Sequence, residues 1–367
     1  MALNPNLPPS TSSAQTHPEP GTSDWLAFLD LLKSGNRAAL GRALTWVEST
    51  RPEDRIRSMA LLEALPEPIA PSFRLGVSGI PGVGKSTWAE AYGLLLLRDQ
   101  PNAKLVVLAV DPSSSVRGGS LLGDKTRMEQ LSLHPRAFVR PSPAGTSLGG
   151  VTWGTRDSIT LCERLGYTHL LVETVGVGQS ETAVHDLVDC LLLLLMPASG
   201  DGLQGMKKGI MEVADVVAVQ KADGLLLSAA QQAAADARTA LHFTSAEESN
   251  WIVPVQTVSA LTGAGMEDLS ATLDQFFRHA HASGRWAERR IGQRKKAFWE
   301  GLEHAAWELL RSNPDNARRW NELAQSVVEN QTDPRRAVED ALRSAGLETV
   351  VRDAVDSGVP FLGICVG

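Results

Sequence analysis

The chain has few cysteines, few tyrosines and no cluster of histidines. Its 367 residues include three cysteines, Cys162, Cys190 and Cys365, and two tyrosines. The cysteines are far apart and form no Cys-x-x-Cys pair, which excludes a disulfide framework and suits a reducing compartment. The eight histidines are also scattered, so the sequence gives no sign of a histidine-rich metal store.

An excess of basic residues and a long apolar run are also missing. Acidic residues number 42 and basic residues 35, which gives a net charge of −7. Because a protein that neutralises nucleic-acid phosphates needs a basic face, we expect no nucleic-acid partner. The longest apolar run, Cys190–Met196, is too short to cross a bilayer, so we expect no membrane partner.

The N-terminal part of the chain falls into two segments. Residues 1–22 are rich in Pro, Ser and Thr and lack the basic start and apolar core of a secretory signal. We therefore predict a disordered tail and a cytoplasmic protein. Residues 23–70 carry apolar side chains at helical spacing, which predicts a helical extension with Asp24 as the cap of its first helix.

Residues 71–275 change to short apolar runs with helical segments between most of them. Such alternation is typical of a parallel sheet covered by helices on both faces, and ligands of these sheets bind at the carboxyl ends of the strands. The predicted strands are Arg74–Val77, Lys104–Val110, Ala137–Arg140, His169–Glu173, Cys190–Met196, Val216–Gln220 and Ile252–Thr257.

The C-terminal part shows no strand pattern. Residues 276–347 are predicted to form a helical arm, and residues 348–367 a tail of unassigned role. Aromatic residues make the arm a candidate for oligomerisation: Trp299, Trp307 and Trp320. A basic cluster near its start is expected to be a solvated face, with a subunit or partner contact as the alternative. The cluster comprises Arg285, Arg289, Arg290, Arg294, Lys295 and Lys296.

The first predicted strand leads into a loop with the spacing Gly-x-x-x-x-Gly-Lys-Ser. Glycines at this spacing let backbone N–H groups turn toward phosphate oxygens, and the helix that follows adds its positive N-terminus. The amine of Lys85 is expected to reach the outer phosphates, and the hydroxyl of Ser86 to ligate Mg²⁺. The phosphate-binding loop comprises Gly79, Ile80, Pro81, Gly82, Val83, Gly84, Lys85, Ser86 and Thr87.

Carboxylates follow or end two other strands. Asp111 follows the second strand, and a polar, glycine-rich segment with Asp124 comes after it, as in loops that order on a γ-phosphate. Glu173 ends the fourth strand, and the N–H of Gly176 is expected to approach the γ-phosphate. Most switch GTPases have Asp at the first of these positions and Gln after the glycine. Here Val177 follows the glycine, which leaves the water-positioning residue unassigned and predicts slow hydrolysis without a partner.

The sixth strand ends in the sequence QKAD, which is typical of a guanine-binding motif. The carboxylate of Asp223 can accept hydrogen bonds from the N1–H and the 2-amino group of guanine, whereas adenine offers no such donor pair. Lys221 belongs to the same motif, and Gln220 stands where common GTPases have Asn. In this order and at strand ends, the motifs predict a GTPase that binds GTP or GDP with Mg²⁺. A further loop is expected to contact guanine O6 through Ser259, Ala260 and Leu261.

The chain resembles the MeaB/ArgK/MMAA family in five blocks: GIPGVGKST, DPSSSVRGGSLLGDKTRM, ETVGVGQSE, GLQGMKKGIMEVAD and QKADG. The resemblance extends from about Trp25 to Leu347. It implies an α/β P-loop NTPase fold of the SIMIBI type: a doubly wound, mostly parallel sheet with N-terminal helices and a C-terminal helical dimerisation arm. Members of this family are G-protein chaperones of adenosylcobalamin-dependent acyl-CoA mutases, chiefly methylmalonyl-CoA mutase.

The resemblance also implies a homodimer in which GTP hydrolysis gates cobalamin loading and protects the mutase. Lys207 and Lys208 match the additional switch loop of the family, which responds to the mutase. Two alternatives stay open: a metal-delivery NTPase of the same fold, and a kinase that acts on amino-acid transport components. By motif match, the candidate catalytic residues are Lys85, Asp111, Asp124 and Glu173, and the candidate Mg²⁺ ligands are Ser86, Asp111, Asp124 and Glu173.

Overall fold

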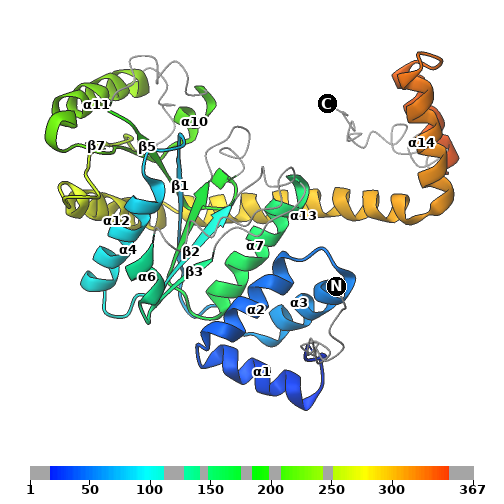
Figure 1. Ribbon diagram of the computed structural model, residues 1–367, viewed down its shortest axis with the longest axis horizontal. Helices are drawn as coiled ribbons and strands as arrows, with labels where there is room; N and C mark the ends of the chain where they lie inside the picture. Colours follow the sequence, from blue (N-terminus) through cyan, green and yellow to red (C-terminus); the bar gives the residue numbers. More distant parts are fainter. Residues whose placement is uncertain are drawn as a thin grey trace, which may run out of the picture. The chain divides into compact units, whose positions relative to one another are not determined.

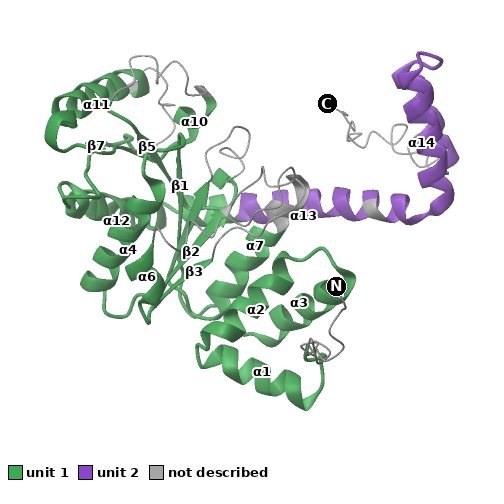
Figure 2. Cartoon of the chain, in the orientation of Figure 1, with its two compact units in different colours: residues 1–290 green, residues 291–367 purple. Residues whose placement is uncertain are grey.

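A computed structural model of the chain divides it into two compact units, residues 1–290 and 291–367 (Figures 1 and 2). The boundary lies inside one long helix, α13 (Arg285–Ser312). None of the helices in the described ranges combines the length and apolar character that a membrane crossing requires. The structure describes residues 17–110, 128–140, 148–174, 184–197, 208–242 and 251–346.

The first unit is built around one seven-stranded sheet of order β3-β2-β4-β1-β5-β6-β7, in which each neighbouring pair is parallel. Strand β1 is central, because Leu75 pairs with Leu171 of β4 on one side and with Cys190 of β5 on the other. The predicted parallel sheet is therefore confirmed. Its strands are β1 (Phe73–Gly79), β2 (Leu105–Val110), β3 (Ala137–Arg140), β4 (His169–Thr174), β5 (Cys190–Leu195), β6 (Val216–Val219) and β7 (Val255–Thr257).

Helices cover both faces of this sheet, which explains why its strands are apolar along their whole length. One face carries α4 (Lys85–Asp99), α6 (Glu129–Leu133) and α12 (Met266–Ala282). On that face Trp88 and Tyr92 stack with ring centroids 4.8 Å apart and are almost completely buried.

The opposite face carries α7 (Leu148–Arg164), α10 (Lys208–Val213) and α11 (Leu227–His242), the last preceded by a 3₁₀ turn, η1 (Gly224–Leu226). These helices and the sheet form a second apolar core. Cys162 lies in this core and Cys190 in the first, and both are free thiols.

The N-terminal helices share that second core. They are α1 (Ser23–Lys33), α2 (Arg37–Glu48) and α3 (Pro52–Ala64), and α2 and α3 pack against α7. Phe28 and Trp46 meet with ring centroids 4.8 Å apart. The cap of α1 is Thr22, whose hydroxyl accepts from the Trp25 N–H at 3.3 Å, so the prediction that Asp24 caps this helix is wrong. The extended backbone at Thr22 places its side chain over the helix end.

The second unit contains the rest of α13 with α14 (Pro314–Val328) and α15 (Pro334–Ser344). Trp307 stacks on Trp320 with centroids 5.3 Å apart, and the Trp320 indole donates to the Ala341 carbonyl at 3.2 Å. Other apolar side chains of α13 remain exposed in this unit, among them Phe298 and Trp299.

Two expectations differ from the structure. Strand β7 begins at Val255 rather than at Ile252, because Pro254 has no N–H for the ladder and contributes only its carbonyl, which accepts from Val217. Two members of the basic cluster are not solvated. Arg289 and Arg290 are mostly buried in ion pairs with carboxylates at the amino edge of the sheet.

Candidate functional site

The loop between β1 and α4 has the backbone that a phosphate-binding loop requires. A Cβ on Gly79, the last residue of β1, would lie 2.5 Å from the carbonyl oxygen of Leu194, so only glycine fits there. Gly82 and Gly84 have φ of 80° and 101°, in the left-handed region that favours glycine. Helix α4 starts at Lys85, so its free N–H groups lie at the loop.

The two polar side chains after these glycines are almost fully buried. Lys85 is 7% exposed, and its Nζ donates to the carbonyls of Gly79 at 2.7 Å and Ile80 at 3.3 Å. Ser86 is 8% exposed, and its hydroxyl donates to Glu173 Oε1 at 2.9 Å. The remaining predicted loop residues complete the turn: Val83 is buried, whereas Pro81 and Thr87 are exposed.

Glu173 lies next to the phosphate-binding loop because β4 is the neighbour of β1. It is opposite Val77 of β1 and Ala109 of β2 in the strand register, at the carboxyl end of the sheet. The hydroxyl of the following residue, Thr174, donates to the Val77 carbonyl at 3.4 Å and ties this strand end to β1. A buried carboxylate and a hydroxyl are thus brought together at the start of α4, and hard oxygen donors of this kind suit Mg²⁺.

Five of the residues singled out from the sequence for the nucleotide site and its switch loops lie outside the described residues: Asp111, Asp124, Gly176, Val177 and Lys207. The strand that precedes the first of them ends at Val110, which pairs with Thr174. Lys208 is the first residue of α10.

The guanine motif follows β6 and touches the phosphate-binding loop. Lys221 has φ of 61°, and its Nζ donates to the Gly82 carbonyl at 2.8 Å. The Asp223 carboxylate accepts a hydrogen bond from the hydroxyl of Ser259, so the two segments that are predicted to bind the base are joined. The backbone also connects them, since the Ala222 N–H donates to the Val258 carbonyl at 3.0 Å.

The segment after β7 is held in place by Ser259, which is completely buried. Its N–H donates to the Ala264 carbonyl at 2.9 Å, and its hydroxyl accepts from the Thr262 N–H at 3.2 Å. Ala260 is half-buried, and the side chain of Leu261 is exposed. These bonds fix the backbone of the three residues that the sequence singles out here.

Gln220, the departure from the common motif, is 2% exposed. Its Oε1 accepts from the Lys221 N–H at 3.3 Å, while its Nε2 is buried and has no hydrogen-bond partner among the residues that the structure describes. A buried unbonded amide donor costs about 1–3 kcal/mol. Gln220, which replaces the usual Asn, therefore places an unbonded amide N–H donor at the carboxyl end of β6.

The contacts that assemble this site are not visible in the sequence. Lys221 and Gly82 are 139 positions apart in the sequence, and Asp223 and Ser259 are 36 positions apart. The motifs indicate which segments belong to the site, but only the strand order brings β6 and β1 to the same edge, with β5 between them. The left-handed backbone of Lys221 also has no sequence signal.

Comparison with known proteins gives consistent results. A sequence model of the family described as methylmalonyl Co-A mutase-associated GTPase MeaB matches residues 40–315. A probable GTPase of Mycobacterium tuberculosis is 42% identical over 316 residues, which cover 86% of this chain and 94% of the relative. The mouse protein called methylmalonic aciduria type A homolog, mitochondrial, is 40% identical over 325 residues, covering 85% of this chain and 77% of the relative.

A solved structure agrees with these sequence relatives. The crystal structure of LAO/AO transport system kinase has a TM-score of 0.68 and 34% identity, and the match covers 87% of this chain and 96% of that one. The P-loop fold and the GTPase activity predicted from the ordered motifs are thereby confirmed. The chain belongs to the MeaB family of GTPases.

Proposed function

We propose that this GTPase is a chaperone of an adenosylcobalamin-dependent acyl-CoA mutase, with methylmalonyl-CoA mutase as the first candidate, and that its GTP cycle gates cobalamin loading and protects the mutase. The family description and the name of the mouse relative support this assignment. The structural observation that carries it is the hydrogen bond between Ser86 and Glu173. That bond connects the phosphate-binding loop to the strand whose continuation is the predicted γ-phosphate sensor.

Lys85 and Asp223 are proposed to bind the two ends of GTP. The Lys85 amine now bonds to loop carbonyls, and exchanging these for the β- and γ-phosphate oxygens would place its charge where negative charge accumulates during hydrolysis. Asp223 would accept hydrogen bonds from guanine, with its carboxylate oriented by Ser259. Lys221, bonded to Gly82, would keep the base-binding segment in register with the phosphate-binding loop.

Ser86 and Glu173 are the described residues that would hold Mg²⁺, together with Asp111 and Asp124. The hydroxyl and the buried carboxylate of the first pair already contact each other, so their oxygens converge on one point at the start of α4. When bound, Mg²⁺ would supply positive charge beside the β- and γ-phosphates. Because Glu173 is 7% exposed, its charge would interact with the ion more strongly than it would in bulk water.

The switch itself is proposed to lie in the segments after β2, β4 and β5. Gly176 follows Glu173 closely, so its N–H would report the presence of the γ-phosphate, and Lys207 and Lys208 would transmit that state to the mutase. Since Val177 stands where switch GTPases have Gln, turnover without a partner is expected to be slow.

We also propose a homodimer that forms through the C-terminal helices in a cytoplasmic protein. The support is the exposed apolar side chains of the second unit, where Phe298, Trp299 and Leu309 are 62%, 47% and 74% exposed. Surfaces of this composition are typical of contacts between protein chains. Sedimentation of the full chain at several concentrations tests this part separately.

Capture of the purified cognate mutase by the tagged full chain tests the chaperone assignment. We expect the amount of captured mutase to differ at least several-fold between GDP and a non-hydrolysable GTP analogue. Lys85→Ala is the matched control, since it should remove the difference between the nucleotides. Equal capture with both nucleotides, or no capture in either state, would contradict the proposal.

The two alternatives make different predictions. A kinase would transfer the labelled γ-phosphate to an acceptor protein, whereas this GTPase is expected to release it as inorganic phosphate. A metal-delivery NTPase would bind nickel or zinc stoichiometrically, which dialysis against the metal followed by elemental analysis would show. Among the residues that the structure describes, no group of three or more His, Cys, Asp or Glu side chains is placed to hold a metal.

A further inference from the structure

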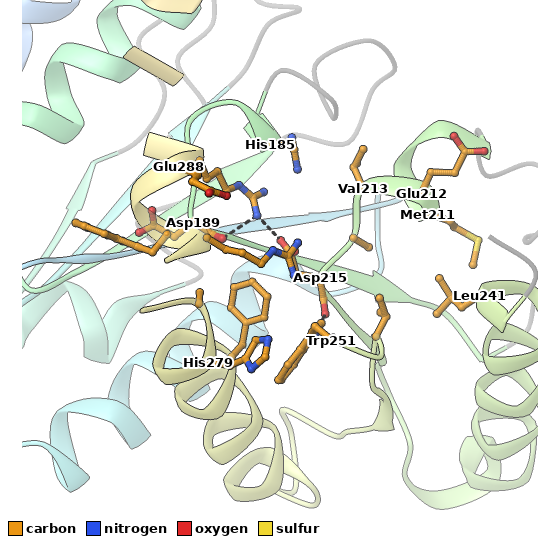
Figure 3. Close-up of a pocket in the computed structure, with 17 residues that line it drawn as sticks. His185, Asp189, Met211, Glu212, Val213, Asp215, Leu241, Trp251, His279 and Glu288 are labelled. Carbon is orange, nitrogen blue, oxygen red and sulfur yellow. Dashed lines mark hydrogen bonds and ion pairs between the residues drawn. The ribbon is translucent and has the colours of Figure 1, made fainter. Parts of the chain in front are cut away.

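A cavity of about 520 Å³ lies at the amino ends of β5 and β6, where Asp189 and Asp215 directly precede the two strands (Figure 3). The phosphate-binding loop and the guanine motif follow the carboxyl ends of the sheet strands, so this cavity belongs to the opposite edge. Its size is that of sites for small organic molecules. None of the described residues assigned to the nucleotide lines it.

Aromatic side chains from two helices and one loop line the cavity: Trp251, Phe276 and Trp286. Trp251 and Phe276 meet edge to face with centroids 5.1 Å apart, and the Trp251 indole donates to the Asp215 carbonyl at 2.9 Å. Figure 3 shows Trp251 and His279 together on one side of Asp215, and their ring centroids are 5.4 Å apart. These contacts give the cavity an ordered apolar wall.

Arg289 contributes an unusual polar group to the same cavity. Its Nη1 donates to the Asp189 carbonyl at 2.9 Å and to Asp215 Oδ2 at 3.0 Å. Its Nε and Nη2 are both buried, and among the described residues neither has a hydrogen-bond partner. These two nitrogens form one edge of the guanidinium, with parallel N–H donors that match the two oxygens of a carboxylate.

Other arginines of the chain show how this edge is normally used. Arg74 donates from Nε and Nη2 to the two oxygens of Glu163 at 2.7 and 2.6 Å. Arg290 does the same to Asp189, at 2.8 and 2.6 Å. Of the three arginines Arg74, Arg289 and Arg290, Arg289 is the one whose Nε and Nη2 edge has no carboxylate of a described residue bonded to it. Leaving two buried donors unbonded costs free energy, and a ligand that accepts hydrogen bonds from both would remove this cost.

The carboxylates close to Arg289 are already bonded. Asp189 accepts from the Arg290 guanidinium and from the Arg74 N–H, and Asp215 accepts from the Leu191 N–H at 2.8 Å as well as from Arg289 itself. Each of these buried carboxylates therefore has a buried guanidinium as its counter-charge. The remaining acidic side chains that line the cavity, Glu212 and Glu288, are exposed.

We propose that this cavity binds a small carboxylic acid with an apolar or aromatic body. Its carboxylate would pair with the Nε and Nη2 of Arg289, and its body would pack against Trp251, Phe276 and Trp286. His279 is a further polar group in the cavity wall, and its buried Nε2 has no hydrogen-bond partner in the described part of the chain. The site is independent of the nucleotide and of the identity of the mutase.

Isothermal titration of the full chain, saturated with GDP and Mg²⁺, tests this proposal. The probes are benzoate, 3-phenylpropanoate and hexanoate, each compared with the neutral amide of the same shape. We expect saturable binding with one site per chain for at least one acid, and at least ten-fold weaker binding of its amide, because an amide cannot form the charge-assisted pair. Absence of saturable binding by all three acids, or equal binding of an acid and its amide, would overturn the proposal.

Arg289→Lys keeps the positive charge but loses the two parallel donors, so the acid should bind at least ten-fold more weakly. Arg285→Lys is the matched control, since Arg285 lines the same cavity but is exposed. The affinity of this control variant for the acid should stay within two-fold of that of the unmodified chain. Unchanged affinity in the Arg289 variant would overturn the assignment of the carboxylate. If that variant does not fold, the comparison of acids with amides on the unmodified chain still decides.

Discussion

The side-chain amine of Lys221 lies 2.8 Å from the carbonyl oxygen of Gly82 and connects the guanine motif to the phosphate-binding loop. Lys221 achieves this with a left-handed backbone, φ of 61°, which a non-glycine residue adopts only at a cost of about 1–3 kcal/mol. Strain of this kind is typical of functional sites. The two halves of the nucleotide site are therefore physically coupled before any ligand contributes.

Replacing Lys221 with Met should weaken GTP binding by removing this connection. A hydrogen bond to a charged group contributes about 1.5–3 kcal/mol, which predicts a rise in Kd of at least ten-fold. Titration with a fluorescent GTP analogue measures this change. Lys33→Met, on the exposed end of α1, should leave Kd unaltered, and equal affinities of the two variants would show that the contact does not support binding.

Lys85→Ala should abolish productive GTP turnover, because no other described side chain of the phosphate-binding loop carries a positive charge to the phosphates. The variant loses, among its contacts, two hydrogen bonds to carbonyls of the same loop, and a change confined to this loop should leave the sheet and its helices folded. Phosphate release at saturating GTP measures the effect, and circular dichroism checks the fold. Turnover at the rate of the unmodified protein would refute the role of this loop.

Asp223→Asn should shift nucleotide preference from GTP toward xanthosine triphosphate. The 2-oxo group of xanthine needs a donor where the 2-amino group of guanine needs an acceptor, and an amide can supply one. Competition between the two nucleotides measures the ratio of their affinities. Asp268→Asn, at an exposed position in α12, is the matched control and should keep the preference for GTP. If both variants select GTP equally, the base is read elsewhere.

The sequence indicates which segments make up the candidate site, and the structure brings the described ones together at one edge of the sheet. Glycine spacing predicted the phosphate-binding loop, because backbone turns with positive φ depend on residue type, as Gly82 and Gly84 show. Continuous apolar runs likewise predicted the buried parallel sheet, because burial of a strand on both faces also depends on residue type along a short stretch of sequence. The position of Glu173 beside Ser86 followed once the strand order was known, since only the order β4-β1 puts these residues side by side.

What the sequence could not predict depends on contacts between distant residues. The basic cluster at the start of α13 looked solvated because charge runs usually are, yet Arg289 and Arg290 are buried by Asp215, Asp189 and Glu163. Aspartates directly before two apolar strands were the available signal for a buried counter-charge. Without the fold, however, nothing connected them to arginines of a helix 74 and 101 positions later.

Asp157 of α7 predicts a measurable pH dependence of stability. Burial raises its pKa from 3.8 to about 6, although Arg156 and Arg55 act in the opposite direction. The folded protein therefore holds this proton more tightly than the unfolded chain does, and the stability that this group contributes falls as pH rises from about 3.8 to about 6.

Asp157→Asn should raise the free energy of unfolding above pH 6 by about 1–3 kcal/mol, since it removes the cost of a buried charge. Below about pH 4 the difference should vanish. Urea unfolding at pH 4 and pH 8 measures both values, with exposed Asp30→Asn as the control. A variant that is less stable than the unmodified protein at pH 8 would show that the Asp157 charge is stabilising.

The most direct test of the chaperone assignment is the rate of GTP hydrolysis at saturating GTP, measured with and without the cognate cobalamin-dependent mutase. The proposed switch predicts slow turnover by the chain alone and a several-fold or greater increase when the mutase is added. The same addition should have no effect on the Lys85→Ala variant. A rate that the mutase leaves unchanged would contradict the account.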